Sequence, residues 1–160
     1  MRGYYDPKAP IIIGCDHGGV RLKQFIKTYL DEHEIPYADI GTDTEEIVRY
    51  PYYAKEVAER ILSGEFTRGI LICSTGIGMS MVANSYPGIR ASLVTDSYTA
   101  RTSREHTDAN VLCLGGKVTG EFVAVDILDI WLNSRFIGGR HNISLDLLDK
   151  FEKEVLKKEY

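Results

Sequence analysis

Short, unbroken apolar runs place the strongest constraint on the fold of this chain. Ile11-Ile12-Ile13 and Ile70-Leu71-Ile72 each hold three apolar residues in succession, without alternating polar residues. Strands of this kind are buried on both faces, as in a parallel sheet covered by helices. Between the runs, apolar residues recur every three or four positions, which is typical of amphipathic helices. The sequence therefore predicts an α/β fold.

Strands and helices alternate along the whole chain. We expect strands at residues 10–14, 37–40, 69–73, 89–94 and 111–114, and helices at residues 20–33, 52–62, 77–84, 97–106, 120–133 and 145–158. Five strands, each followed by a helix, predict a three-layer α/β/α sandwich with a five-stranded parallel, Rossmann-like sheet. A length of 160 residues fits one domain. We expect an N-terminal tail at residues 1–9 and a single domain at residues 10–160.

Charge, hydropathy and cysteine content exclude several classes of protein. The net charge of −4 argues against nonspecific binding of nucleic acid, which needs a basic surface. No apolar run reaches the ~18 residues of a membrane helix, and the N-terminus lacks the apolar segment of a secretory signal. The three cysteines, an odd number, stand at ends of predicted strands rather than in a disulfide framework. We therefore expect a cytoplasmic protein without nucleic-acid or membrane partners.

Polar and glycine-rich segments follow several of the predicted strands. In open parallel sheets, ligands bind outside the carboxyl ends of the strands. The residues placed there are Asp16-His17, residues 73–78, Asp96 and Gly115-Gly116. The sequence therefore predicts a ligand site at this edge of the sheet.

The segment after the third strand reads Ser74-Thr75-Gly76-Ile77-Gly78. Its glycines let backbone N–H groups approach a ligand, and the start of the next helix adds a partial positive charge. Such a loop can hold a phosphate or a developing oxyanion. It is not a Walker loop, because no Lys-Ser/Thr pair follows. The alternative is a helix cap with structural glycines.

Cys73 lies directly before this loop. A thiolate at a helix N-terminus is stabilised by the helix dipole, so this residue is a candidate base. The alternative is a small buried hydrophobic residue, which is the interpretation we give to Cys15 and Cys113.

Asp16 and His17 form a second candidate pair at the end of the first strand. A carboxylate and an imidazole there are suited to moving the hydroxyl protons of a polyol. The alternative for Asp16 is a cap on the following helix.

Further candidates are His106, Lys117 and Arg140. His106 ends a predicted helix, where its cationic form is favoured, and it suits a proton donor. Arg140 follows Gly138-Gly139 and suits a bidentate grip on phosphate, to which Lys117 adds positive charge. Each also fits a surface cap or a solvated loop. We predict no metal site, because the histidines lack ligand spacing.

Taken together, these segments resemble the type B ribose-5-phosphate isomerase family, which includes the galactose-6-phosphate isomerase subunits. The resemblance covers roughly residues 11–153. The segments that carry it are Gly14-Cys15-Asp16-His17, Tyr50-Pro51, residues 73–80, Ala83-Asn84, residues 87–90, residues 103–106, residues 108–111 and Gly138-Gly139-Arg140-His141.

This resemblance implies an enzyme that interconverts an aldose phosphate and a ketose phosphate without metal or cofactor. Cys73 matches the base that moves a proton between the first two sugar carbons. Residues 74–78 match the loop that stabilises the enediolate, and Thr75 matches a proton-shuttling hydroxyl. Asp16 and His106 match residues linked to opening the furanose ring. The substrate-binding positions, several of which bind phosphate, are Asp16, His17, Ser74, Thr75, Gly76, Ile77, Gly78, Thr107, Lys117 and Arg140.

The resemblance also implies a homodimer in which each site draws residues from two subunits, with pairing into tetramers left open. Three positions depart from the usual family pattern: Ser144 and Lys117 stand where arginines are common, and Thr107 stands where asparagine is common. The family resemblance makes ribose 5-phosphate the expected substrate, and the three departures keep other sugar phosphates open. A six-carbon substrate (allose or galactose 6-phosphate) and a noncatalytic sugar-phosphate-binding homologue are the alternatives. A thiol redox protein is disfavoured, because no resolving cysteine is nearby in sequence.

Overall fold

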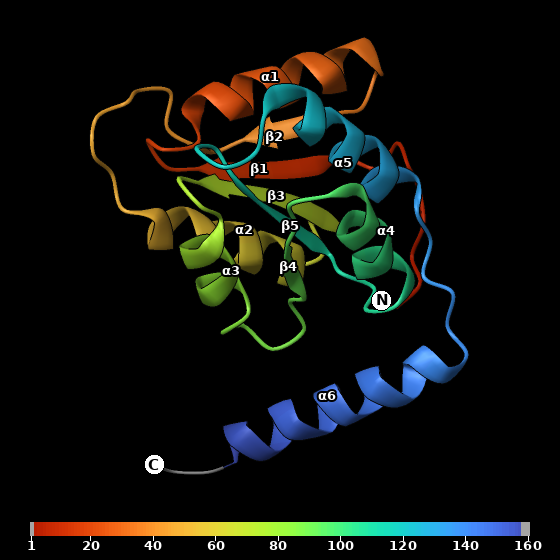
Figure 1. The fold of residues 1–160 in the computed structure, drawn as a ribbon. Coiled ribbons are helices and arrows are strands. Elements are labelled where there is room, and N and C mark those ends of the chain that lie inside the picture. The colour runs from red at the N-terminus through yellow and green to blue at the C-terminus, as the bar shows by residue number, and fades with distance from the viewer. Residues whose placement is uncertain (1, 158–160) are drawn as a thin grey trace.

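Within residues 2–157, five parallel strands and six helices make up the fold (Figure 1). The structure is a computed structural model that describes residues 2–157. The elements in chain order are β1 (Ile11–Cys15), α1 (Val20–Glu32), β2 (Tyr37–Asp39), α2 (Tyr50–Leu62), β3 (Arg68–Cys73), α3 (Ile77–Ala83), β4 (Ala91–Leu93), α4 (Ser97–Glu105), β5 (Val111–Gly115), α5 (Glu121–Asn133) and α6 (Arg140–Leu156). The predicted α/β class and parallel sheet are confirmed.

Helices cover both faces of the sheet, as the unbroken apolar runs require. Successive residues of a strand point to opposite faces. Ile11 and Ile13 pack in the core with α1 and α5, whereas Ile12 packs on the other face with α2 and α3. Figure 1 shows the same three layers. All three isoleucines have no exposed surface, so together they stabilise the packing on both faces of the sheet.

The strand order is β2-β1-β3-β5-β4. The chain runs outward from β1 to β2 and then crosses back to β3, so the order reverses between β1 and β3. Ligands of open parallel sheets bind at such a switch point, outside the carboxyl ends of the strands. The register aligns Cys15 with Ile72 and Cys73 with Gly115, which brings the ends of β1, β3 and β5 to one level.

Several predicted boundaries need correction. The last helix begins at Arg140 rather than at residue 145, so Arg140 is a helical residue and not part of a loop. The second helix begins at Tyr50, with Pro51 in its first turn. β4 covers three residues, Ala91–Leu93, where six were expected. The predicted end of the last helix at Lys158 lies outside the described residues.

Helix α6 stands apart from the other layers in Figure 1. Of its described residues, Leu145 is the buried one. Within residues 2–157, none of the helices combines the length and apolar character that crossing a bilayer demands.

Candidate active site

The loop from β3 to α3 is built around Cys73 and Gly76. Gly76 caps α3 with φ of 77°, a left-handed conformation that glycine adopts without strain. This turn directs the Gly76 N–H at Cys73 Sγ, at 3.1 Å. The neighbouring Ile77 N–H donates to Thr75 Oγ1 at 3.3 Å. Two N–H groups of the predicted anion loop are thus bonded within the loop, and an incoming oxyanion competes with the sulfur and the hydroxyl for them.

Cys73 is almost covered within one chain. Its side chain is 5 % exposed and packs in the core cluster that contains Leu71 and Met79. The other two thiols have no exposed surface. Burial raises the pKa of Cys15 to about 12 and also raises the pKa of Cys113, so neither is a base near neutral pH. Cys73 is the thiol that meets both the glycine loop and the carboxyl edge of the sheet.

The loop from β1 to α1 packs directly on Ser74. Asp16, 4 % exposed, accepts the Gly18 N–H on Oδ1 at 2.8 Å. Helix α1 is instead capped by Gly19 without a side-chain bond, so the alternative of Asp16 as a helix cap is wrong. A Cβ atom added at Gly18 would lie 2.2 Å from Ser74 Oγ. The two loops are therefore in contact, as expected at a switch point.

His17 is oriented by the segment that leads into α2. Its Nδ1 accepts the Val48 N–H at 3.4 Å, which leaves Nε2 to carry the proton of the neutral ring. The start of this segment is held by Lys23, a side chain without exposed surface. Lys23 Nζ donates to the carbonyl of Thr42 at 2.9 Å and to Asp43 Oδ1 at 2.7 Å. A buried ammonium group thus fixes one end of the loop that contacts His17.

The turn after β5 completes the carboxyl edge. The Gly116 N–H donates to the Cys73 carbonyl at 2.7 Å, and the Lys117 N–H donates to the Ser74 carbonyl at 3.0 Å. The Lys117 side chain is exposed. Backbone bonds therefore hold Lys117 beside the loop, while its ammonium group faces solvent.

Tyr50 contacts the same loop, a role that sequence reasoning missed. A Cβ atom at Gly78 would lie 2.7 Å from the Tyr50 ring, so the ring rests on the first turn of α3. The available signal was Gly78 itself, because a helical glycine often marks a close approach by another group.

The remaining predicted residues lie in a second cluster. The rings of His106 and His141 stack with centroids 4.2 Å apart and planes 10° apart. Burial lowers the pKa of His141, as do the neighbouring charges of His106 and Arg140. Thr107 Oγ1 donates to the Ser103 carbonyl at 2.6 Å. Arg140 is exposed at the first position of α6.

Within one chain, the two clusters lie at opposite ends of the parallel strands. His106 and Thr107 come just before β5, whereas Cys73 pairs with Gly115 at the end of β5. The four residue steps from Val111 to Gly115 span about 13 Å at the usual strand rise. The structure therefore does not bring Cys73, His106 and Arg140 around one pocket of the same chain.

His106 and Thr107 line a cavity of about 290 Å³ at the free side of β4, with Leu93 and Thr99 among the other lining residues. Leu93 also reaches the β3–α3 loop, because a Cβ atom at Gly76 would lie 2.5 Å from Leu93 Cδ1. Leu93 thus lies between the loop of Cys73 and this cavity.

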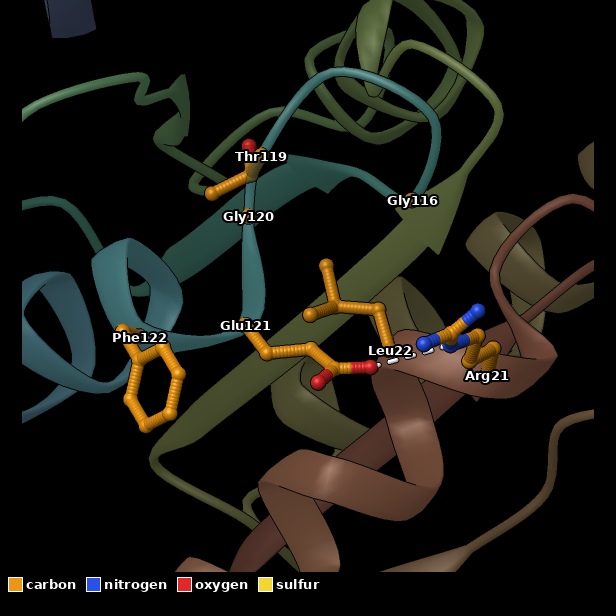
Figure 2. Close-up of a pocket in the computed structure, with 7 residues that line it drawn as sticks. All are labelled: Arg21, Leu22, Gly116, Thr119, Gly120, Glu121 and Phe122. Atoms are coloured by element: carbon orange, nitrogen blue, oxygen red, sulfur yellow. Dashed lines mark hydrogen bonds and ion pairs between the residues drawn. The ribbon is translucent and has the colours of Figure 1, made fainter.

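A different cavity, of about 300 Å³, lies between α1 and the start of α5 (Figure 2). One of its lining residues, Gly116, belongs to the turn that the sequence predicts to be part of the ligand site. Arg21 and Glu121 point toward each other in Figure 2 and form an ion pair at 2.9 Å. The residues predicted for catalysis do not line it. Across residues 2–157, no group of three or more His, Cys, Asp or Glu side chains is arranged to hold a metal ion.

Comparison with known proteins identifies the family. The sequence model of the Ribose/Galactose Isomerase family matches residues 11–148. The chain belongs to the ribose/galactose isomerase family. This confirms the resemblance seen in the sequence, and the family match covers both clusters.

Members of the ribose/galactose isomerase family resemble the chain over nearly its full length. A putative sugar phosphate isomerase, YwlF, of Bacillus subtilis is 46% identical over 91% of this chain and 99% of its own length. Ribose-5-P isomerase B of Listeria innocua is 43% identical, over 90% of this chain and 97% of its own. The structure of ribose-5-phosphate isomerase B of Clostridium thermocellum is 48% identical, with a TM-score of 0.89 over 91% of this chain and 99% of the other.

Proposed function

We propose that this chain interconverts ribose 5-phosphate and ribulose 5-phosphate through a cis-enediolate. The observation that carries the proposal is the contact of Cys73 Sγ with the Gly76 N–H at the switch point of the sheet. A thiolate held there is stabilised by a backbone dipole and faces the loops of Asp16 and Lys117. Family membership and the named relatives support the choice of a sugar phosphate.

In the proposed reaction, Cys73 removes the proton from C2 of the open-chain aldose and returns it to C1. The negative charge develops on the sugar oxygen, where backbone N–H groups of residues 74–78 stabilise it. Thr75 moves the proton between the two oxygens, so that no net charge or cofactor is needed. Asp16 and His106 open the furanose ring first, with His106 as the acid.

Substrate binding uses His17, Thr107, Lys117 and Arg140. The cationic Lys117 and Arg140 are exposed and free to meet a phosphate dianion. Fixing the phosphate places the reacting carbons over the sulfur, which lowers the entropic cost of proton transfer.

The proposed site is shared between two subunits of a homodimer. The geometry favours this because Cys73 and His106 of one chain lie at opposite ends of the parallel strands. Helix α6 offers a surface for a second copy, because the exposed side chains of Ile143, Leu147, Phe151 and Val155 recur every four residues along one face of the helix.

 Their exposed fractions are 64 %, 46 %, 51 % and 56 %, respectively. Apolar stripes of this kind mark interaction sites, and a second copy that covers this one also brings its own α6, with Arg140, to a neighbouring site. Pairing of dimers into tetramers is left open. The three free thiols suit a reducing compartment such as the cytoplasm.

Coupled assays with ribose 5-phosphate, allose 6-phosphate and galactose 6-phosphate, run side by side, test the proposed substrate. We expect kcat/KM for ribose 5-phosphate to exceed the values for both hexoses by at least about tenfold, the discrimination that about 1.4 kcal/mol of binding provides. A preference for either hexose phosphate would refute the pentose assignment. Binding without turnover of all three sugars would favour the noncatalytic alternative.

Arg49 is expected to supply part of the positive charge that Ser144 lacks. It precedes α2 and is exposed, next to Val48, whose N–H donates to His17. The change Arg49→Ala should raise KM by about tenfold, because a hydrogen bond to a charged group contributes roughly 1.5–3 kcal/mol. We expect kcat to remain within about twofold, since Arg49 contacts no reacting carbon.

The matched control is Arg60→Ala, at the other end of the same helix, where Arg60 pairs with Glu65. Steady-state kinetics of both variants decide the outcome. An unchanged KM in Arg49→Ala, or an equal rise in both variants, would show that Arg49 does not bind the phosphate.

A further inference from the structure

The segment of residues 2–9 precedes the family match, which begins at residue 11, yet it contacts three separate parts of the fold. We refer to residues 2–9 as the strap. We propose that Arg2, at the start of the strap, is a positioning residue that holds α6 and thereby sets the place of Arg140. This inference rests on the proposed function, in which Arg140 binds the phosphate of the substrate.

Backbone bonds anchor the strap to the body of the protein. The Gly3 N–H donates to Asp108 Oδ2 at 2.9 Å, and the Tyr4 carbonyl accepts from Arg104 Nη2 at 3.3 Å. Further along, the Ala9 carbonyl accepts from Arg68 Nη2 at 3.2 Å. Arg68 and Arg104 are each 3 % exposed, so strap carbonyls accept hydrogen bonds from two buried guanidinium groups. Such groups are costly to leave without acceptors, and this fixes the path of the strap.

Arg2 connects the anchored strap to α6. Its Nη1 donates to Asp146 Oδ1 and its Nη2 donates to Asp149 Oδ2, each at 2.6 Å. The two aspartates are three residues apart and therefore share one face of the helix. One planar guanidinium spans both carboxylates, a geometry that fixes direction as well as distance.

The connection between α5 and α6 is bonded to the body of the protein through the Ile137 N–H, which donates to the Glu105 carbonyl at 3.1 Å, and it then ends in two glycines. Gly138 and Gly139 precede the helix with φ of 64° and 56°, in the left-handed region that favours glycine. A Cβ atom at Gly139 would meet nothing within 4 Å. Within the single chain, Leu145 is the buried residue among the described part of α6, so polar contacts help to orient the helix: those of Arg2, and the bond from the Gly88 N–H to Glu152 Oε2 at 3.2 Å.

Arg2 and Arg140 act on the same rigid element. Asp146 lies six residues after Arg140, about 9 Å along the helix axis. A helix released at Asp146 and Asp149 turns about the two glycines, and this changes the direction of its first turn, where Arg140 stands and His141 stacks on His106. The expected consequence is weaker binding of phosphate with little change in the chemical step.

The test compares Arg2→Gln, the double variant Asp146→Asn/Asp149→Asn, and the triple variant that combines them. For each protein we would measure KM and kcat with ribose 5-phosphate, and the inhibition constant of inorganic phosphate. We expect both KM and the inhibition constant to rise by about twofold to fivefold in Arg2→Gln, the range set by partly exposed ion pairs. The triple variant should match the double variant, because Arg2 acts through these two carboxylates. The conservative variant Arg2→Lys should recover part of the loss.

Lys150→Gln is the matched control, because it breaks an ion pair on α6, with Glu154, that does not involve the strap. Its KM should equal that of the unchanged protein. A purely structural role of Arg2 would lower the unfolding temperature and leave KM and the phosphate inhibition constant unchanged, and that result would overturn the proposal. So would a triple variant with additive losses.

Hydrogen exchange separates this proposal from the proposed function. Amides of residues 146–156 should exchange faster in Arg2→Gln than in the unchanged protein, whether or not the enzyme acts on ribose 5-phosphate. If the unchanged protein isomerises none of the sugars tested, the proposed function fails, and the exchange rates alone decide whether Arg2 holds α6. Equal exchange rates in the two proteins would overturn the positioning role.

Discussion

Replacing Cys73 by alanine is expected to lower kcat by about 10³–10⁴-fold, since a positioned base contributes up to that amount. The sulfur is the group that the Gly76 N–H contacts at 3.1 Å, at the level where β1, β3 and β5 end. Alanine cannot accept a proton from the sugar, whereas the loop and the phosphate-binding residues remain. We therefore expect KM to change little and turnover to be lost. Steady-state assays measure kcat and KM, and circular dichroism checks that the fold is retained.

The control for this variant is Cys113→Ala, which makes the same change in the same core cluster. Cys113 has no exposed surface, and we expect its loss to cost about 1 kcal/mol of stability. Its kcat should stay within about threefold, as for a residue that takes no part in proton transfer. Substantial turnover by Cys73→Ala would remove Cys73 from the mechanism.

The second large effect is expected from Gly76→Ala. Gly76 has φ of 77°, and a Cβ atom there would lie 2.9 Å from the Leu114 carbonyl carbon, a backbone atom that cannot move aside cheaply. The left-handed conformation costs an alanine roughly 1–2 kcal/mol, and overpacking adds about 1–3 kcal/mol. We expect the free energy of unfolding to fall by about 2–5 kcal/mol. Because the loop must shift, the N–H that contacts Cys73 moves too, and kcat should fall by about 10²-fold or more.

Gly64→Ala is the control for Gly76→Ala. Gly64 has φ of 83°, but a Cβ atom there would meet nothing within 4 Å. It should therefore lose about 1 kcal/mol through backbone strain alone, with unchanged kcat. Chemical denaturation and kinetics of the two variants separate strain from contact. Equal losses of activity at Gly64 and Gly76 would contradict a specific role for the β3–α3 loop.

Much of the fold follows from local patterns. Runs such as Ile70-Leu71-Ile72 indicate strands buried on both faces, and they coincide with β strands that are covered on both sides. The start of α6 could not be predicted from such patterns. Residues 140–144 are polar or exposed, and the apolar pattern becomes regular only near Leu145. The shortness of β4 also escaped prediction, because it is an edge strand whose length depends on one neighbour.

The meeting of these segments at the carboxyl ends of the strands was predicted from the sequence, because parallel strands bring their ends to one level. Asp16, Cys73 and Gly116 do meet there. The position of His106 relative to Cys73 was not predicted from the sequence. His106 follows α4 and therefore lies at the opposite end of the strands from Cys73. Contacts between distant segments, such as Tyr50 on Gly78 and Arg2 on Asp149, leave no periodic signal along the chain.

The central claim is that Cys73 of one subunit and His106 of its partner serve the same site. The direct test is to co-express differently tagged Cys73→Ala and His106→Asn chains and to purify the mixed dimer through both tags. Each variant alone should be nearly inactive. In the mixed dimer, one of the two sites holds both native residues, so about half of the unchanged activity should return for a symmetric pair. Activity no higher than that of the separate variants would contradict the shared site.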